Sequence, residues 1–445
     1  MDHNIFNMTA KEYKKYHESF MENNHGSTPV HTFLCIFFTV QCSIFCALNI
    51  KYPITYQYLY EYMVIVLPLI LAHTILSNYI YLLNFIIFTL LLKHLYTIYS
   101  KLKLRKTYIK KNYFKSNKLH SISCLRGLTY LITVFCILAV DFNIFPRHLA
   151  KTENYGYSLM DTGVGLFVLM SGLVHKNSKN NNFTMLIRSN IKFVTILIIL
   201  GVARFISIKQ LDYQEHVTEY GVHWNFFFTL AICKVISTVI LLYTKHALFA
   251  SILLLVVHEY LLIIGLEKWV FGDTLRTNII NANREGISSS LGYVTLYLFA
   301  AYLKSVLLDE NNNRYTIQIK LTLFSVCFWL SCFIANFYRP ASRTLANASY
   351  CLYLESVLLI VITFLYFFEV QFHSNNTDFS VPLILSAVND NGLLYFLVAN
   401  LCTGAINLSI NTLFVSPIGA LLILNMYMVL LVCLVICLKQ NGIRI

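Results

Sequence analysis

The sequence predicts an all-α polytopic transmembrane protein, and three observations carry that prediction. Of its 445 residues, 57% are hydrophobic and only 12% are charged, whereas about 25% of a soluble domain is charged. Many windows reach the roughly 20 apolar residues that a helix needs to cross a bilayer. Tyr and Phe number 30 and 33, as expected where aromatic rings lie at lipid interfaces. We therefore expect a single membrane domain over residues 1–445.

Apolar windows separated by short polar loops predict about 13 spans. The second and third windows are nearly continuous. The windows fall near residues 30–49, 57–76, 78–98, 123–141, 158–175, 190–208, 224–243, 246–265, 288–308, 317–337, 346–371, 392–413 and 416–438.

Charge predicts how the chain is oriented. The formal net charge is +13, and the loop from Lys101 to Lys118 carries eight Lys and Arg with no acid. Basic loops stay on the cytosolic side and meet anionic lipid, so we expect no nucleic-acid partner. Alternation then places the connection at 141–157 on the luminal side. The polar segment 1–29 would also be luminal; it has no early apolar core, so we expect no cleaved signal peptide.

The first candidate site surrounds Asp141. No other acid occurs between Glu61 and Asp141, yet Lys151, Glu153 and Asp161 follow within 21 residues. A carboxylate at a partly dehydrated helix end can act as a general base, and a nearby lysine could keep it ionised or stabilise an oxyanion. The alternative is a structural ion pair that fixes the loop.

A second polar cluster, at 212–225, precedes the span near 224–243. His216 and His223 are seven residues apart, which would place them near one side of a helix. Either histidine could act as a base or bind a sugar or phosphate. The spacing fits no standard metal motif, and an interfacial polar cap is the alternative. The other polar residues of interest here are Glu219, Trp224 and Asn225.

Two further groups are polar. The stretch 281–287 is a compact turn before a span, and its arginine could bind a phosphate through the planar guanidinium; a helix cap with a loop salt bridge is the alternative. Three asparagines spaced seven and four apart near the window 392–413 would share one stripe of a helix, either lining a polar cavity or hydrogen-bonding other helices. These groups comprise Asn283, Arg284, Glu285, Asn400, Asn407 and Asn411.

Five blocks of sequence resemble, in the same order, the eukaryotic inositol acyltransferases of GPI-anchor synthesis, the PIG-W family. The first block contains the acidic cluster, and the N-terminal stretch from Tyr13 to Thr28 is also similar. The blocks are AVDFNIFPRHLAKTENYGYSLMDTGVG from Ala139, DYQEHVTEYGVHWNFFFTL from Asp212, NREGI from Asn283, SRTLANASY from Ser342 and LVANLCTGAINLSINT from Leu397.

The resemblance implies a multi-pass enzyme of the endoplasmic reticulum membrane. It would transfer an acyl chain, typically palmitoyl, from acyl-CoA, as co-substrate, to an inositol hydroxyl of glucosaminyl-phosphatidylinositol. We expect neither a cofactor nor a metal. In the family, an aspartate and the lysine ten residues after it form the expected catalytic pair. Asp141 and Lys151 of this chain match these two positions. One departure is visible: the family commonly has two arginines after the proline, where this chain has Arg147-His148.

We expect direct transfer, in which Asp141 takes the proton of the inositol hydroxyl and Lys151 tunes Asp141 or steadies the oxyanion. A covalent acyl-enzyme on Ser158, Ser171 or one of several cysteines ranks lower, because no obvious base adjoins any of these residues in sequence. A lipid or sugar transporter is the alternative function, and an acyltransferase that relies on a buried His258 is a further one. The expected substrate contacts are Arg147, Glu153, Asp161, His216, Glu219, His223, Trp224, Asn225, Asn283, Arg284, Glu285, Asn400, Asn407 and Asn411.

Overall fold

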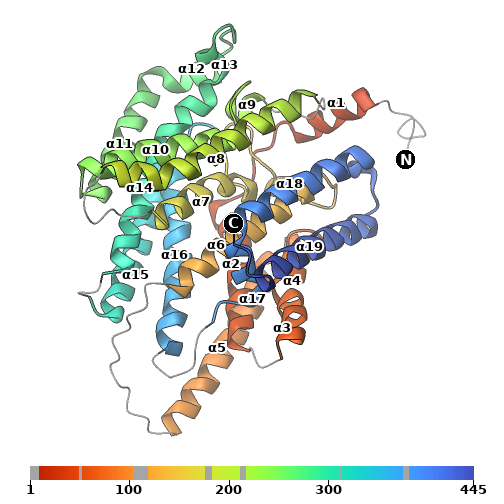
Figure 1. Cartoon of the computed structure of the whole chain (residues 1–445), viewed down its shortest axis with the longest axis vertical. Coiled ribbons are helices and arrows are strands. Elements are labelled where there is room, and N and C mark those ends of the chain that lie inside the picture. Colours follow the sequence, from red (N-terminus) through yellow and green to blue (C-terminus); the bar gives the residue numbers. More distant parts are fainter. Residues whose placement is uncertain are drawn as a thin grey trace. The chain divides into compact units, whose positions relative to one another are not determined.

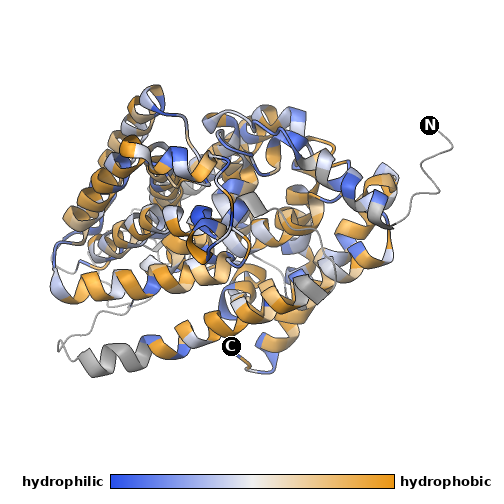
Figure 2. Cartoon of the chain, turned by 90° about the horizontal axis from the view of Figure 1, so that it is seen from above, coloured by the Kyte–Doolittle hydropathy of each residue, from blue (hydrophilic) through white to orange (hydrophobic). Residues whose placement is uncertain are grey.

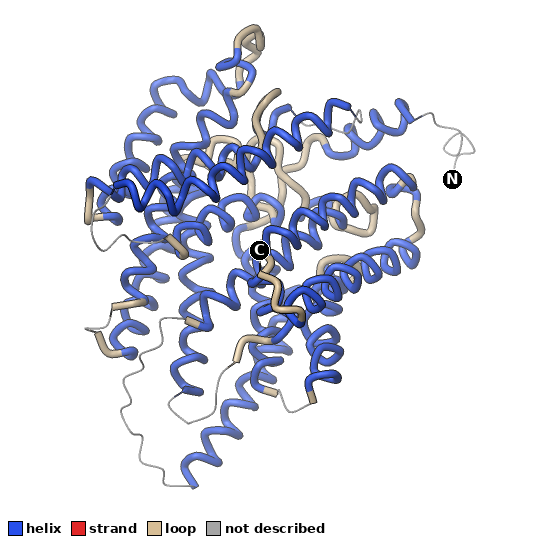
Figure 3. Tube along the Cα trace, in the orientation of Figure 1, coloured by secondary structure: helices blue, strands red, loops and turns tan. Residues whose placement is uncertain are grey.

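The computed structural model describes residues 10–49, 53–104, 119–175, 183–210, 217–309, 312–373 and 380–444. These residues are helices and loops without a β-strand (Figures 1 and 3), which confirms the all-α prediction. The helices are α1 (Ala10–Met21), α2 (Pro29–Leu48), α3 (Ile54–Glu61), α4 (Leu67–Ala72), α5 (Ile80–Leu104), α6 (His120–Ala139), α7 (Leu159–Leu173), α8 (Phe183–Gln210), α9 (Val217–Tyr220), α10 (Phe226–Tyr243), α11 (Ala247–Leu261), α12 (Glu267–Phe271), α13 (Ile279–Ala282), α14 (Arg284–Leu307), α15 (Arg314–Tyr338), α16 (Ala348–His373), α17 (Leu383–Asp390), α18 (Gly392–Ser409) and α19 (Pro417–Gln440).

Most of these helices are membrane helices by length and composition. Among the described residues, ten are long and apolar enough to span a bilayer, and two shorter apolar helices cover 56–72 and 159–173. Apolar residues run along most of the longer helices (Figure 2). Every predicted window overlaps a helix, including 190–208, which lies within α8. The polytopic prediction is confirmed, but the count of about 13 spans is not.

The chain forms two compact units, which we call the α6 unit and the α14 unit after their central helices. The chain passes between the units at several points, and one of these falls inside α16. The expectation of a single domain stays a prediction. The α6 unit comprises Gly26–Lys151, Ser158–Met160 and Leu359–Ile445, and the α14 unit comprises Met1–His25, Thr152–Tyr157 and Asp161–Leu358.

In the α6 unit, α6 packs against α17 and α18, both of which also contact α19, and α2 packs against α5. The contact between α6 and α17 is a close approach of backbones. A Cβ added at Gly127 of α6 would lie 2.6 Å from the carbonyl oxygen of Leu385 on α17. Small residues permit such contacts between membrane helices, where dispersion rather than the hydrophobic effect holds helices together.

Two buried glutamates of the same unit cap the N-termini of other helices. The carboxylate of Glu61 accepts hydrogen bonds from the backbone N–H groups of Leu383 and Ile384, 2.8 and 2.7 Å long, at the start of α17. Glu369 accepts from the first two N–H groups of α6 at 3.0 and 2.9 Å. The first N–H groups of a helix have no partner within it, and the helix dipole favours an anion there. Both acids therefore stabilise helix starts.

In the α14 unit, α14 packs against α9, α10 and α11, and α8 packs against α10. The central helix is largely buried, and Tyr293, Tyr297 and Phe299 are among the largest side chains with less than 2% exposure. Helix α11 continues into α12 through a π turn at Leu262–Leu266, in which Gly265 has a φ of 149°. This irregular turn bends the end of a long apolar helix.

Candidate functional site

Asp141 lies in the turn after α6, in the α6 unit, and is only 7% exposed. Its Oδ2 accepts a hydrogen bond of 2.8 Å from Nδ2 of Asn407 on α18. The hydroxyl of Tyr427 on α19 lies 3.1 Å from the carbonyl oxygen of Val134 on α6 and 3.4 Å from that of Ala399 on α18. Asn407 thus holds the buried carboxylate, and Tyr427 links the helices on either side of that contact.

The chain between Asp141 and Lys151 makes a short 3₁₀ turn at Arg147–Leu149. Arg147 and His148 are half-buried, and burial lowers the pKa of both side chains. The ring of His148 meets that of His31 on α2 edge-on, with 5.1 Å between centroids. Lys151 is exposed and belongs to the same unit as Asp141. The predicted pair therefore combines a buried acid with a solvent-accessible ammonium group.

Asp161 lies in the first turn of α7, in the α14 unit, and is 2% exposed. Its Oδ1 accepts from Nε of Arg343 at 2.9 Å. Its Oδ2 accepts from both the backbone N–H and the hydroxyl of Thr152, at 3.0 and 2.7 Å. The hydroxyl of Tyr350 donates to the carbonyl of Asp161 at 2.7 Å. One carboxylate oxygen thus holds Thr152, the residue that directly follows Lys151, while the other binds Arg343.

Arg343 is a buried cation that the sequence did not mark as a site residue. It is 4% exposed, and its guanidinium lies 5.8 Å from the ring centre of Tyr220. Burial opposes its charge, but the carboxylates of Glu219 and Asp161 outweigh burial and raise the pKa of Arg343 above its usual range. It therefore stays charged and balances the two acids. Glu219, expected to contact substrate, lies close enough to act on this ion pair.

The segment after Thr152 is held in place by hydrogen bonds within the α14 unit. The carboxylate of Glu153 accepts from the N–H of Asn23 at 2.9 Å, and the N–H of Glu153 donates to the carbonyl of Asn24 at 3.1 Å. Three residues later, the N–H of Gly156 donates to the carbonyl of Ala341 at 2.8 Å. Glu153, expected as a substrate contact, thus joins this loop to the N-terminal segment.

The expected alignment of two histidines on one helix is wrong. Helix α9 is only four residues long and ends at Tyr220, and the next residue, Gly221, has a φ of 111° that turns the chain. His223 lies beyond this turn with an exposed side chain, and His216 lies outside the described residues. Among the residues that the structure describes, no three His, Cys, Asp or Glu side chains gather where they could hold a metal ion.

Trp224 and Asn225 serve the start of α10. The Oδ1 of Asn225 accepts from the N–H groups of the second and third residues of α10, at 3.0 and 3.3 Å, which is a helix N-cap. Its Nδ2 donates to the carbonyl of Gly201 on α8 at 2.9 Å. The indole N–H of Trp224 donates to the hydroxyl of Thr229 at 2.9 Å. These contacts favour the interfacial cap over a substrate site.

The group at 283–285 also makes internal contacts. Oδ1 of Asn283 accepts a backbone N–H from the loop before α10 at 2.8 Å. The guanidinium of Arg284 donates to the carbonyl of Thr274 at 3.1 Å and to the hydroxyl of the same residue. Glu285, which is 3% exposed, pairs with Arg276 at 2.5 Å. The contacts favour the alternative of a helix start with a loop salt bridge.

The three asparagines do not share one helical stripe, which corrects the sequence expectation. Helix α18 ends at Ser409, so Asn411 lies beyond it and is exposed. Asn400 donates to the carbonyl of Phe396 in its own helix at 2.7 Å. Only Asn407 reaches another predicted site residue, Asp141. Of the three asparagines, Asn407 is thus the one whose hydrogen bond links α18 to the candidate site around Asp141.

The sequence profile of the GWT1 family matches residues 13–438 of the chain. The chain belongs to the GWT1 family. The human protein named glucosaminyl-phosphatidylinositol-acyltransferase PIGW is 32% identical, over 95% of this chain and 96% of its own length. The cattle (Bos taurus) protein of that name is 33% identical over 82% and 84%. GPI-anchored wall transfer protein 1 of Schizosaccharomyces pombe is 37% identical over 74% of each chain. The family resemblance is thereby confirmed.

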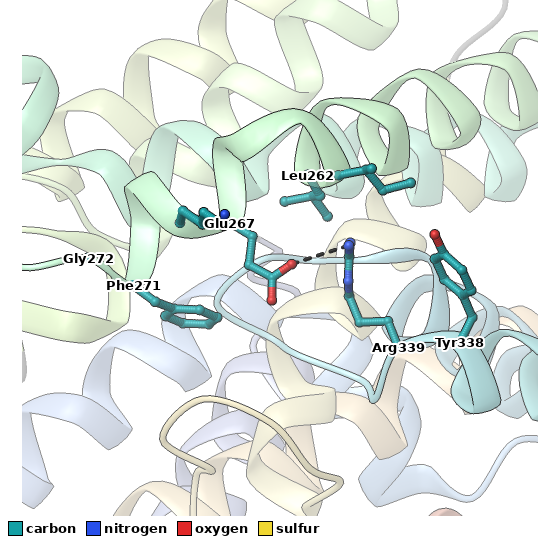
Figure 4. A pocket seen from close by; sticks show the side chains of 8 residues that line it. Leu262, Glu267, Phe271, Gly272, Tyr338 and Arg339 are labelled. Atoms are coloured by element: carbon teal, nitrogen blue, oxygen red, sulfur yellow. Dashed lines mark ion pairs between the residues drawn. The ribbon is translucent and has the colours of Figure 1, made fainter.

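This member of the GWT1 family also contains a charged cluster that the sequence did not connect. In the α14 unit, Arg339 at the end of α15 pairs with Glu259 of α11 at 2.5 Å and with Glu267 of α12 at 3.2 Å. The pair of Glu267 and Arg339 lines a pocket (Figure 4). Arg339 is 80 and 72 positions from Glu259 and Glu267. In the sequence, the one sign of this cluster is Glu259, an acid inside a predicted span.

Proposed function

We propose that this chain acylates an inositol hydroxyl of glucosaminyl-phosphatidylinositol, with acyl-CoA as the donor and palmitoyl as the expected chain, in the endoplasmic reticulum membrane. Two relatives named as glucosaminyl-phosphatidylinositol acyltransferases align with more than four-fifths of the chain. The observation that carries the chemical part is the buried Asp141 carboxylate, held by Asn407 at the end of a membrane helix.

In the proposed reaction, Asp141 accepts the proton of the inositol hydroxyl as its oxygen attacks the thioester carbonyl carbon. The new C–O bond gives a tetrahedral oxyanion, which the Lys151 ammonium stabilises. The C–S bond then breaks, the acyl group remains on inositol, and the proton passes from Asp141 to the departing CoA thiolate. A general base is worth roughly 10²–10⁴ in rate, so Asp141 would supply a large share of the acceleration.

The contacts of Thr152 support a fixed position for Lys151. Thr152 is held at both its N–H and its hydroxyl by Asp161, and Asp161 is in turn held by Arg343. Placing a lysine ammonium costs conformational entropy of both the backbone and the side chain. Because the backbone here is already fixed, only the side-chain cost remains. We assign Asp161 and Arg343 to positioning rather than to contact with the substrate.

The test is to incubate purified protein in lipid nanodiscs with labelled acyl-CoA and glucosaminyl-phosphatidylinositol. The proposal predicts a lipid product that carries one additional, labelled acyl chain. A transporter, the alternative function, would leave the lipid unmodified. Substitution of His258 addresses the other acyltransferase mechanism: this histidine is fully buried and its Nε2 lies 2.9 Å from the carbonyl oxygen of Leu345, so His258→Gln should retain far more activity per folded protein than Asp141→Asn.

A further inference from the structure

A pocket of about 610 Å³ opens in the α14 unit, between the α11–α12 segment and the end of α15. Pockets that bind small ligands fall in the range of about 300–1,000 Å³. Glu267 and Arg339 point toward one another across it, with Phe271 and Tyr338 beside them (Figure 4). The remaining lining residues are Leu262, Ile263, Lys268 and Gly272.

The pocket wall includes an irregular stretch of helix. The π turn at Leu262–Leu266 contains Gly265, whose φ of 149° lies outside helical values, and a Cβ added there would meet no atom within 4 Å. Single π turns within α-helices occur frequently at functional sites. Here Glu267 and Lys268 directly follow the turn, and both line the pocket.

The charges in and beside the pocket are of both signs. The Arg339 guanidinium bridges Glu259 and Glu267, and Glu267 also accepts a hydrogen bond from the hydroxyl of Tyr155. Burial and the Glu267 carboxylate raise the pKa of Tyr155, which keeps the hydroxyl a donor. Glu267 nevertheless remains 29% exposed, and the exposed Lys268 makes no ion pair within the described part of the chain. Glu267, although it is already paired with Arg339, and Lys268 are thus both accessible to a ligand at the pocket.

The surroundings are those of a lipid-facing surface. Beside the pocket, Ile264 of the π turn is 64% exposed and Phe337 of α15 is 92% exposed. The two spans concerned, Ala247–Phe271 and Arg314–Tyr338, are only 17% and 22% buried within the protein. Apolar surface of this extent in a membrane protein contacts acyl chains. A ligand with a polar headgroup and apolar chains would therefore match both the charged pocket and the apolar helix faces beside it.

We propose that this pocket binds the headgroup of a phospholipid that carries both an ammonium and a phosphate. Glu267 would receive the ammonium and Lys268 the phosphate, while the acyl chains lie against the exposed faces of α11 and α15. Two lipids share this chemistry: an ethanolamine phospholipid of the bulk membrane and glucosaminyl-phosphatidylinositol, whose sugar bears a free amine. Only the second source rests on the proposed function.

The test uses photoreactive lipids and the full chain in nanodiscs, with crosslinks mapped to residues 259–272 and 334–339 by mass spectrometry. Phosphatidylethanolamine should label these peptides about threefold more than phosphatidylglycerol, which lacks the ammonium; this is the size of effect that a solvent-accessible charge pair gives. Glu267→Gln should abolish that preference. Lys268→Gln should lower labelling by both lipids about threefold, and Lys245→Gln, an exposed lysine on the α10–α11 loop, should change nothing.

A second arm separates the two lipid sources. If the site takes the substrate, glucosaminyl-phosphatidylinositol competes with the ethanolamine probe, and Glu267→Gln raises its KM for acyl transfer without lowering kcat. If the site takes bulk lipid, that competition is absent and KM is unchanged. Labelling needs no acyl transfer, so an inactive protein that keeps the preference contradicts the proposed function alone. Equal labelling by all lipids in the wild type and both variants overturns the pocket proposal.

Discussion

At the residue scale, the two proposed catalytic groups are fixed in different ways. Asp141 is buried, and a side-chain amide of α18 holds its carboxylate. Lys151 is exposed, and we propose that it is positioned by the backbone beside it, where Asp161 binds Thr152 twice. A hydrogen bond to an ionised group contributes about 1.5–3 kcal/mol, so the carboxylate contacts of Thr152 are strong enough to matter for the geometry of Lys151.

Thr152→Val tests the positioning role. Valine has the shape of threonine and keeps the N–H contact, but it loses the hydroxyl contact to Asp161. We expect kcat to fall about tenfold, the effect of about 1.4 kcal/mol, with KM for acyl-CoA unchanged, because binding does not depend on this contact. Thr152→Ser should restore kcat. Equal kcat values in all three proteins, measured per folded enzyme, would show that the contact is only structural.

The residues of this site differ in how far sequence could identify them. Asp141 and Lys151 are recognisable because isolated charges beside apolar spans are rare and the family motif surrounds them. The partner of Asp161 is Arg343, 182 positions away, and no periodicity links the two. The contact of Asn407 with Asp141 spans 266 positions. Such pairings depend on which helices pack together, and hydropathy does not reveal that.

At the element scale, the close contact of α6 with α17 should limit substitution at Gly127. Its added Cβ would lie 2.6 Å from a backbone oxygen, and forced separation of packed segments costs about 1–3 kcal/mol. Gly127→Ala should therefore lower the unfolding midpoint in detergent. Gly404→Ala on α18 is the control, since no atom lies within 4 Å of its added Cβ and alanine favours a helix. A Gly127→Ala protein as stable as Gly404→Ala would contradict the packing.

The end of α7 should make stability depend on pH. His175 is buried, and burial, followed by the charges of Lys234 and Lys304, lowers its pKa from 6.5 to about 4. The unfolded chain therefore binds a proton at higher pH than the folded protein does. Stability should fall as pH drops from 6.5 to about 4, by up to about 3 kcal/mol, and level off below. Unfolding midpoints should show a weaker pH dependence in His175→Gln, but not in a control at the exposed His246.

The sequence predicted the helices correctly where apolar runs are long. It missed the short helices whose formation depends on distant contacts or on a single turn residue. Each of the windows near 30–49 and 346–371 became a single continuous helix. Helix α17 was not expected, because its eight residues are too few to cross a bilayer and its start depends on the distant carboxylate of Glu61. The loop residues at 217–220 form an isolated turn of helix because Gly221 ends it. Local pattern alone contains neither cause.

At the scale of the whole molecule, orientation in the membrane remains a prediction from charge. Basic loops on the cytosolic side place the N-terminus in the lumen. The sequon at Asn7 would then be open to glycosylation, whereas the sequon at Asn182, in a predicted cytosolic loop, would not. Both lie outside the described residues. Asn7→Gln should remove a glycosidase-sensitive gel shift, and Asn182→Gln should leave it. The reverse pattern would invert the orientation.

The central claim is that the Asp141 carboxylate takes the proton of the inositol hydroxyl. The most direct measurement is single-turnover acyl transfer by purified Asp141→Asn, which keeps the size of the side chain but is a very weak base. Matching size-exclusion profiles of the variant and the wild-type protein would show that both are folded. We predict a loss of at least about 10²-fold in rate, the range for a general base. A rate within about threefold of the wild-type rate would contradict the role of Asp141 as the general base. A change of that size is no larger than the loss of one exposed charge pair would cause.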